Sequence, residues 1–347
     1  MKLIKKLLAM ALAGVMLLTI LTGCSGGKTG DRLVEEYMTT WLSENSGGNI
    51  PVTHDVPEIK TVADMFKASW LNDSGDWTIS PNSSTYTTLQ NVFSNYENGY
   101  TVNLYAFEVD SKQNELNQAM RVMSATTTDE GLPIHTSIGW STAIQCATRL
   151  VTRGDKSYRI AVIIYDHHAV GQQGGTTMNT MKKILALALA GVMALALLTG
   201  CGTGSSASHK SIAKAMADYD NSLHRKTTIT CTSSAVLDAK LQEQAKKPGF
   251  EDVVKNVYKG TLTSFTIPSN SDLSGKVVYL YCGKYDKDAG KQAINLNAHY
   301  AYSSSTSTLA DVREIGLITT SFTDDTTGKE VKVRFAVVVS DIPTATP

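Results

Sequence analysis

The chain has no excess charge of either sign, since its 347 residues include 32 lysines and arginines and 32 aspartates and glutamates. Nucleic-acid-binding proteins usually carry a basic excess that neutralises phosphates, so this balance predicts no nucleic-acid partner. Hydrophobic residues make up 42% and charged residues 18% of the chain, which excludes both a disordered tail and a multispanning membrane protein. The length is about twice that of a typical domain and predicts two globular domains.

The sequence also lacks the short motifs that carry a defined catalytic mechanism. It contains no P-loop, G-x-S-x-G, H-E-x-x-H or paired C-x-x-C. The seven histidines are scattered, and only His167 and His168 are adjacent. Neighbouring side chains on a strand point to opposite faces, so this pair is not expected to hold one metal ion. The expectation is therefore a protein without metal or cofactor, and more plausibly a non-enzyme.

An export signal is indicated at the start of the chain. Lys5-Lys6 precede the apolar residues 7–21, and Leu21-Thr22-Gly23-Cys24 closes the segment. A basic start, a short apolar run and small residues at the end are typical of a signal peptide, and the run is shorter than the roughly 20 residues of a spanning helix. Leu21-Thr22-Gly23-Cys24 resembles the lipobox of bacterial lipoproteins. This resemblance implies cleavage before Cys24 and a diacylglyceryl group on its thiol.

A second copy of this signal lies in mid-chain. Residues 182–201 match residues 5–24 without a gap and are identical at 15 of 20 positions, ending again in Thr-Gly-Cys at Cys201. By the same resemblance, Cys201 is a second lipid attachment residue. Three explanations stay open: two lipoprotein genes fused in frame, two chains written as one, or a missed start at Met181. A buried core helix at residues 184–198 is the fourth, but it leaves the repeated Lys-Lys and Thr-Gly-Cys unexplained.

The two halves also resemble each other beyond the signals, which predicts a tandem duplication. Three short matches occur in the same order at offsets near 176 residues. These are Val102–Tyr105 with Val278–Tyr281, Ile138-Gly139 with Ile315-Gly316, and Arg159–Asp166 with Arg334–Asp341.

Hydrophobic periodicity predicts an α+β fold in each half, with N-terminal helices followed by an antiparallel β-meander and the helices packed on one sheet face. The expected helices are 31–46, 61–71 and 85–95 in the first half, and 211–223, 235–247 and 250–258 in the second. The expected strands are 100–110, 114–124, 134–152 and 156–166, then 262–267, 276–285, 293–302, 312–323 and 331–341. This order of elements resembles the NTF2-like or cystatin-like α+β roll, although no motif supports the resemblance.

Three cysteines and two arginines are the remaining candidates for a site. Export permits disulfides, so Cys231 and Cys282 could pair, although two small buried thiols are the more common outcome. Arg159 and Arg334 occupy matching places in the last strands, where each could hold an anion or lie on the solvent face with its stem on apolar neighbours.

The sequence as a whole predicts a lipid-anchored cell-envelope protein on the extracytoplasmic side of the cell membrane, with a non-catalytic binding or scaffolding role. Its expected partners are the membrane, through the lipid anchors, and an envelope protein or a glycan; the two domains could also contact each other. The alternative is an exported small-molecule enzyme or carrier that uses a pocket between sheet and helices. The expected segments are signal peptide 1–23, tether 24–30, domain 31–170, linker 171–180, second signal 181–200, tether 201–210 and domain 211–343.

The intact mass of the membrane-extracted product tests the two signals. One lipidated species of about 37 kDa less the first signal would show that the halves stay joined. Two lipidated species of about half that size would show cleavage or separate starts at the second signal. An unlipidated product would contradict the lipobox interpretation at both cysteines.

Overall fold

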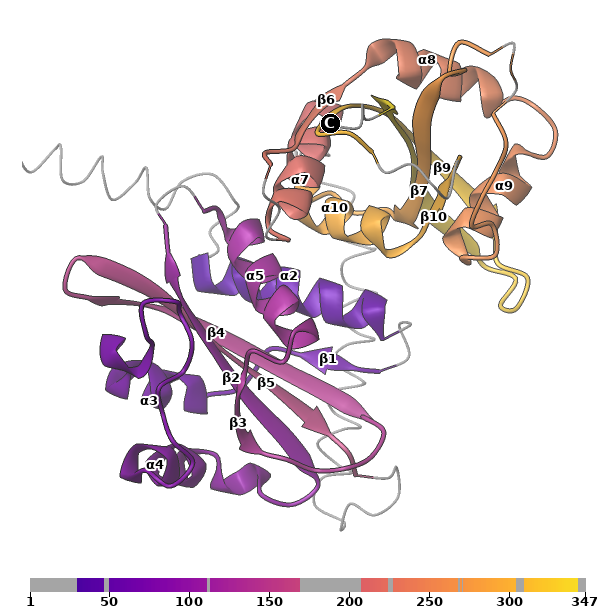
Figure 1. Ribbon diagram of the computed structural model, residues 1–347. Coiled ribbons are helices and arrows are strands. Elements are labelled where there is room, and N and C mark those ends of the chain that lie inside the picture. The colour runs from indigo at the N-terminus through magenta and orange to yellow at the C-terminus, as the bar shows by residue number, and fades with distance from the viewer. Residues whose placement is uncertain are drawn as a thin grey trace, which may run out of the picture.

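The computed structural model describes residues 30–46, 50–110, 113–168, 207–223, 227–267, 269, 271–303 and 309–342, and both predicted signal segments lie outside these ranges. The described residues form two domains, here called domain 1 (30–168) and domain 2 (207–342), each with one five-stranded sheet (Figure 1). The predicted α+β fold class is confirmed.

The elements of domain 1 follow in this order: α2 (Gly30–Asn45), β1 (Val52–Thr53), α3 (Glu58–Met65), η1 (Ala68–Trp70), α4 (Ser84–Val92), η2 (Ser94–Tyr96), β2 (Tyr100–Val109), α5 (Glu115–Thr127), β3 (Leu132–His135), β4 (Ala143–Arg153) and β5 (Lys156–Asp166). The elements of domain 2 are α7 (His209–Asn221), β6 (Thr230–Ser233), α8 (Ala235–Gln244), α9 (Phe250–Tyr258), β7 (Lys276–Lys284), α10 (Ala289–Ala298), β8 (Tyr300–Tyr302), β9 (Val312–Thr323) and β10 (Glu330–Asp341).

The two sheets have the same topology. The strand orders are β1-β4-β5-β2-β3 and β6-β9-β10-β7-β8. In each sheet only the short first strand pairs in parallel, β1 with β4 and β6 with β9, and the other neighbours are antiparallel. Because element order, strand order and strand direction all agree, α2, α5 and β4 of domain 1 correspond to α7, α10 and β9 of domain 2. This agreement is what a tandem duplication produces.

Strand register tests the three sequence matches. Leu104 lies opposite Val162, and Leu280 lies opposite Val337. Residues paired by the first and last sequence matches therefore occupy the same places in the two sheets. The match of Ile138 with Ile315 is wrong. Ile138 lies in the loop before β4, whereas Ile315 lies within β9 opposite Val338. The residue of domain 1 that corresponds to Ile315 is Cys146, which lies opposite Ile163.

The expected antiparallel meander is corrected to a mixed sheet interrupted by a helix. Residues 114–124 and most of 293–302, predicted as strands, form α5 and α10. Each helix begins at a side-chain cap, Asn114 accepting from the Asn117 N–H and Asp288 from the Lys291 N–H, both at 2.9 Å. The predicted strand 134–152 is two strands, β3 and β4, and 262–267 makes only one isolated bridge, at Ser264.

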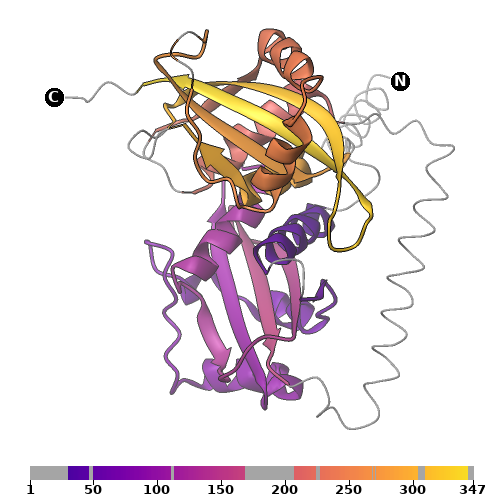
Figure 2. The ribbon, with the colours of Figure 1, turned by 90° about the vertical axis from the view of Figure 1, so that its right-hand side faces the viewer.

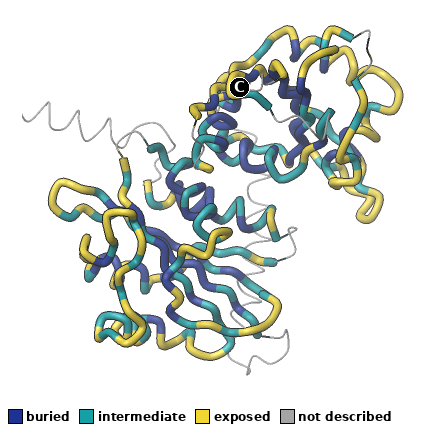
Figure 3. Tube along the Cα trace, viewed as in Figure 1, coloured by how far each residue is buried: buried dark blue, intermediate teal, exposed yellow. Residues whose placement is uncertain are grey.

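Helices cover both faces of each sheet, not one face as expected. In domain 1, α2 and α5 lie on one face, while α3 and α4 lie on the other. In domain 2, α7 and α10 lie on one face, and α8 and α9 on the other. Figures 1 and 2 show the resulting layers, with α2, α5, α7 and α10 between the two sheets. The buried residues of Figure 3 gather in these sheets and in the helices between them.

Acidic side chains cover the strand edges that β1 and β6 are too short to pair. The Thr148 N–H of β4 donates to Glu35 of α2 at 3.0 Å, and the corresponding Leu317 N–H of β9 donates to Asp238 of α8 at 2.7 Å. Burial raises the pKa of Glu35, while the Thr148 N–H and the charge of Arg149 oppose this shift. A strand edge blocked in this way cannot pair with another chain.

Two glycines allow helices to approach the sheet of domain 2 closely. A Cβ on Gly283 of β7 would lie 2.3 Å from the backbone of Asn295 in α10, and a Cβ on Gly316 of β9 would lie 2.5 Å from Leu237 of α8. Neither position tolerates a larger residue without moving a helix. The backbone of Gly30, by contrast, has space for a side chain.

We expect Gly283→Ala to destabilise the protein by about 1–3 kcal/mol, because the new methyl group must push α10 away from β7. Thermal unfolding should show a decrease in Tm of about 2–12 °C. The matched control is Gly30→Ala, which should leave the Tm unchanged. Equal effects of the two substitutions would contradict the close packing of α10 on β7.

Candidate functional site

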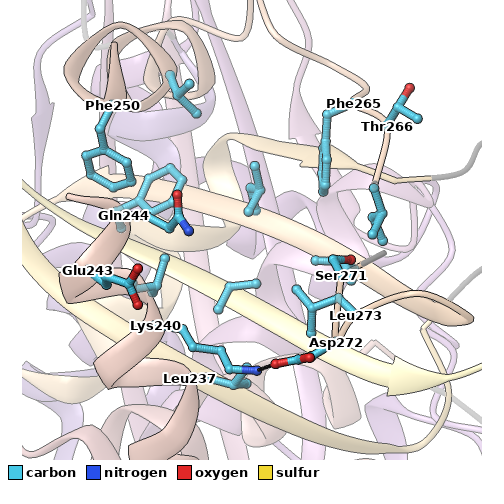
Figure 4. Close-up of a pocket in the computed structure, with 17 residues that line it drawn as sticks. Leu237, Lys240, Glu243, Gln244, Phe250, Phe265, Thr266, Ser271, Asp272 and Leu273 are labelled. Carbon is cyan, nitrogen blue, oxygen red and sulfur yellow. Dashed lines mark hydrogen bonds and ion pairs between the residues drawn. The ribbon is translucent and has the colours of Figure 1, made fainter. Parts of the chain in front are cut away.

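A cavity of about 600 Å³ lies in domain 2 between α8, α9 and the face of the sheet formed by β7 and β10 (Figure 4). Its walls are mostly apolar and aromatic. The apolar lining residues are Leu237, Leu241, Phe250, Val253, Phe265, Ile267, Leu273, Val278, Leu280, Phe335 and Val337.

Local features of the sequence explain why residues of α8, of α9 and near Phe265 line the cavity. Leu237 and Leu241 are four residues apart, so both lie on the face of α8 that is turned to the sheet. Gly249 adopts the left-handed conformation, with φ of 83°, and turns the chain into α9. Phe250 then packs edge-on against Phe335, with ring centroids 5.4 Å apart. The Phe265 N–H donates to Tyr302 O at 3.1 Å, which fastens the irregular wall to β8.

The same face of domain 1 is filled by aromatic side chains. Phe66 packs against Trp70 and Tyr158, with centroids 5.5 Å and 5.3 Å apart, and Phe93 is fully buried beside them. Strand register makes Tyr158 the counterpart of Val333, so domain 2 has a smaller side chain at this position. The two copies of the fold therefore use their outer faces differently.

The polar lining residues of the cavity are Lys240, Glu243 and Gln244 of α8 together with Thr266, Ser271 and Asp272. Lys240 and Asp272 form an ion pair of 2.5 Å, and they point toward each other in Figure 4. The hydrogen bond from Lys240 holds the pKa of Asp272 below its usual value. The hydroxyl of Ser271 is buried and has no hydrogen-bond partner among the described residues. These groups could orient the polar end of a ligand whose body lies on the apolar walls.

The ionisable lining residues of the cavity are Lys240, Glu243 and Asp272. Its described lining residues include no histidine, cysteine or tyrosine, and Glu243 and Gln244 of α8 are its other acidic or amide side chains. A nucleophile with an adjacent base is not assembled among them. The arrangement suits binding of an apolar molecule of small-ligand size, for which cavities of roughly 300–1,000 Å³ are usual.

A second cavity, which the sequence analysis missed, is lined by tyrosines. It measures about 320 Å³ and contains Tyr219, Tyr279, Tyr281 and Tyr300 together with the buried ion pair of Asp220 and Arg313. The rings of Tyr279 and Tyr300 are stacked at 5.8 Å. The signal in the sequence was the alternation of tyrosines in two segments, which places their side chains on one face of neighbouring strands.

The two predicted lipid attachment residues, Cys24 and Cys201, lie outside the described residues. The Cys231–Cys282 disulfide that the sequence allowed is absent, since both thiols are free. Cys231 lies in β6 and Cys282 in β7, and β9 and β10 separate these strands. Three strand spacings amount to about 14 Å, whereas a disulfide needs Cα atoms within about 7 Å.

The matched arginines are buried rather than solvent-facing. Arg159 is 1% exposed; its guanidinium forms an ion pair with Asp31 and donates to Gln118 at 2.7 and 2.9 Å. Arg334 is 2% exposed, donates to Ala207 O and lies over the Tyr285 ring. Groups of the protein itself thus surround both arginines, and neither arginine lies in an open anion site.

Wider comparisons do not identify the protein. Family models, curated proteins and solved structures were compared with the chain, and none matches it. Within the described ranges, no three histidine, cysteine or acidic side chains are gathered as a metal site. The helices in these ranges include none that is long and apolar enough to cross a membrane.

Burial raises the pKa of Cys146, Cys231 and Cys282 to about 12 each. At pH 8 only about one thiol in 10,000 would then be ionised, so native protein should react very slowly with a disulfide reagent. In denaturant we expect three reactive thiols if Cys24 and Cys201 carry lipids, and five if they do not. A count of one with lipidated protein would show that Cys231 and Cys282 are bonded after all.

Proposed function

We propose that this protein is a lipid-anchored component of the bacterial cell envelope that binds an apolar small molecule in domain 2 without catalysing a reaction. Diacylglyceryl groups on Cys24 and Cys201 would hold it on the extracytoplasmic side of the membrane. Two acyl chains are sufficient for stable attachment, whereas a single chain gives only reversible binding.

The observation that carries the binding role is the cavity between α8, α9 and the sheet. Apolar surface that stays exposed to water inside a cavity costs free energy, and a ligand that covers it gains about 25 cal/mol for each Å² removed from water. The Lys240–Asp272 pair at one side provides a polar contact that could fix the direction of the ligand. A carrier of an amphiphilic molecule fits this combination better than an enzyme, because Lys240 and Asp272 pair with each other and the Ser271 hydroxyl has no base among its described partners.

A glycan is the second candidate ligand, and the tyrosine cavity favours it. Sugar rings stack on aromatic faces, and their hydroxyls pair with carboxylate, amide and guanidinium groups. These four kinds of group lie within one cavity and belong to Tyr279, Asp220, Asn297 and Arg313. This site would be available in the same molecule whether or not the apolar cavity is occupied.

A photoreactive apolar probe tests the first proposal in native membranes. An alkyl diazirine should crosslink to the cavity walls, and peptide mass spectrometry should find the adducts between residues 237 and 280 and at residues 335–337. Leu280→Trp fills the cavity from β7 and should reduce these adducts about tenfold, equivalent to about 1.4 kcal/mol of binding.

The matched control is Val312→Trp, which adds the same indole at a residue that is 74% exposed and outside the cavity. It should leave the adducts unchanged, and both variants should keep the wild-type Tm. Adducts that persist in Leu280→Trp would show that the probe labels another surface, and the apolar ligand proposal would be abandoned.

A further inference from the structure

The two domains contact each other through corresponding helices in a reciprocal manner. Helix α2 of domain 1 packs on α10 of domain 2, and α7 of domain 2 packs on α5 of domain 1 (Figures 1 and 2). Since α2 corresponds to α7 and α5 to α10, exchanging the domains converts each contact into the other. This is the pattern of a twofold dimer, in which one surface patch meets a copy of itself.

The contact of α2 with α10 combines an ion pair and a close approach. Lys291 Nζ lies 2.6 Å from Glu36 Oε2, and these side chains are only 22% and 11% exposed. Gly290 leaves space for the Tyr37 ring, because a Cβ there would lie 2.5 Å from Tyr37 Cζ. Burial and the neighbouring Asp288 carboxylate raise the pKa of Tyr37. Helix α10 thus provides both an opposite charge for Glu36 and space for the ring of Tyr37.

In its contact with α7, helix α5 uses the same positions that its counterpart α10 uses in the contact with α2. Asn114 Nδ2 donates to Asp218 Oδ2 at 2.8 Å, and Asn117 Nδ2 donates to Asp218 O at 2.9 Å. Asn114 and Asp288 are the N-caps of α5 and α10, and Asn117 and Lys291 follow three residues later. Two corresponding positions therefore face the other domain in both halves of the interface.

Apolar packing continues across the interface without a break. One cluster of buried side chains joins both sheets through the four helices, and it includes Leu33 and Met120 of domain 1 with Met216 and Ile294 of domain 2. Tyr37 is 7% exposed and Met216 is 4% exposed. Such burial is typical of obligate interfaces, which resemble the core of one domain.

We propose that this interface is sufficient by itself to hold the two domains together, so that a chain divided between them remains a single 1:1 particle. Two lipoproteins produced from the two signals would then act as one heterodimer. The proposal needs neither the ligand nor the lipids of the proposed function, because it rests only on the helix contacts.

The test uses the full chain in detergent, with a specific protease site replacing residues 171–180. After cleavage, both fragments should elute together at 1:1 stoichiometry when diluted to about 1 μM. Fragments that elute separately, each with the circular dichroism of a folded domain, would overturn the proposal.

Interface variants show whether the helices or a shared micelle hold the fragments together. Asn114→Asp keeps an efficient N-cap but places its carboxylate beside Asp218. It should weaken the cleaved pair at least tenfold, and adding Asp218→Asn should restore it. Asn91→Asp makes the same chemical change at an exposed residue of α4 and should have no effect.

A second pair of variants tests the other half of the interface. Gly290→Leu introduces a good helix-forming residue, so a loss of pairing would come from the collision with Tyr37 and not from a weaker helix. Adding Tyr37→Ala should restore pairing. If the fragments of both the Asn114→Asp and the Gly290→Leu variant still elute together as tightly as those of the wild type, the shared micelle holds them together. That result would overturn the proposal.

Discussion

The structure depends on one requirement: four helices must bury the inner faces of two sheets at the same time. A helix of a single domain presents one apolar stripe to its sheet and leaves the opposite side to solvent. Here α2, α5, α7 and α10 lie between sheets, and α2 carries buried residues on both sides, with Val34 and Tyr37 among them. The helices of each domain therefore complete the core of the other, and the domains form one continuous interior.

This shared interior leaves the outer faces of the two copies freer to differ than the inner ones. Inner residues of each copy contact the other copy, so a change there affects both domains. The outer helices have no such constraint. Domain 1 fills its outer face with Phe66, Trp70 and Phe93, whereas domain 2 leaves a cavity of about 600 Å³ between its outer helices and its sheet. Duplication of a fold with one constrained and one free face permits a binding function in one copy while the other supports it.

Local signals in the sequence predicted some elements well and others poorly. The strand Lys156–Asp166 and the helix Phe250–Tyr258 match their predicted bounds, because the strand is a continuous apolar run after a Gly-Asp turn and the helix is amphipathic after Pro248-Gly249. Helix α5 was read as a strand although Leu116, Ala119, Met120 and Met123 have helical spacing behind a capping Asn114. The two residues of β1 carry no pattern and form a strand only by pairing with β4. The cavity and the interface arise from packing between distant segments, which a periodic pattern does not encode.

Acidic side chains cover one edge of each sheet, on β4 in domain 1 and on β9 in domain 2. Strands with free N–H groups would pair with any neighbouring chain. In domain 1, Glu35 accepts from Thr148 N and Asp31 accepts from Leu150 N, so the free length of β4 is covered by α2 itself. In domain 2, Asp238 and Glu251 accept from Leu317 N and Thr323 N of β9. Carboxylates thus cover the edges of β4 and β9 beyond β1 and β6, while the two domains combine through the apolar faces of their helices.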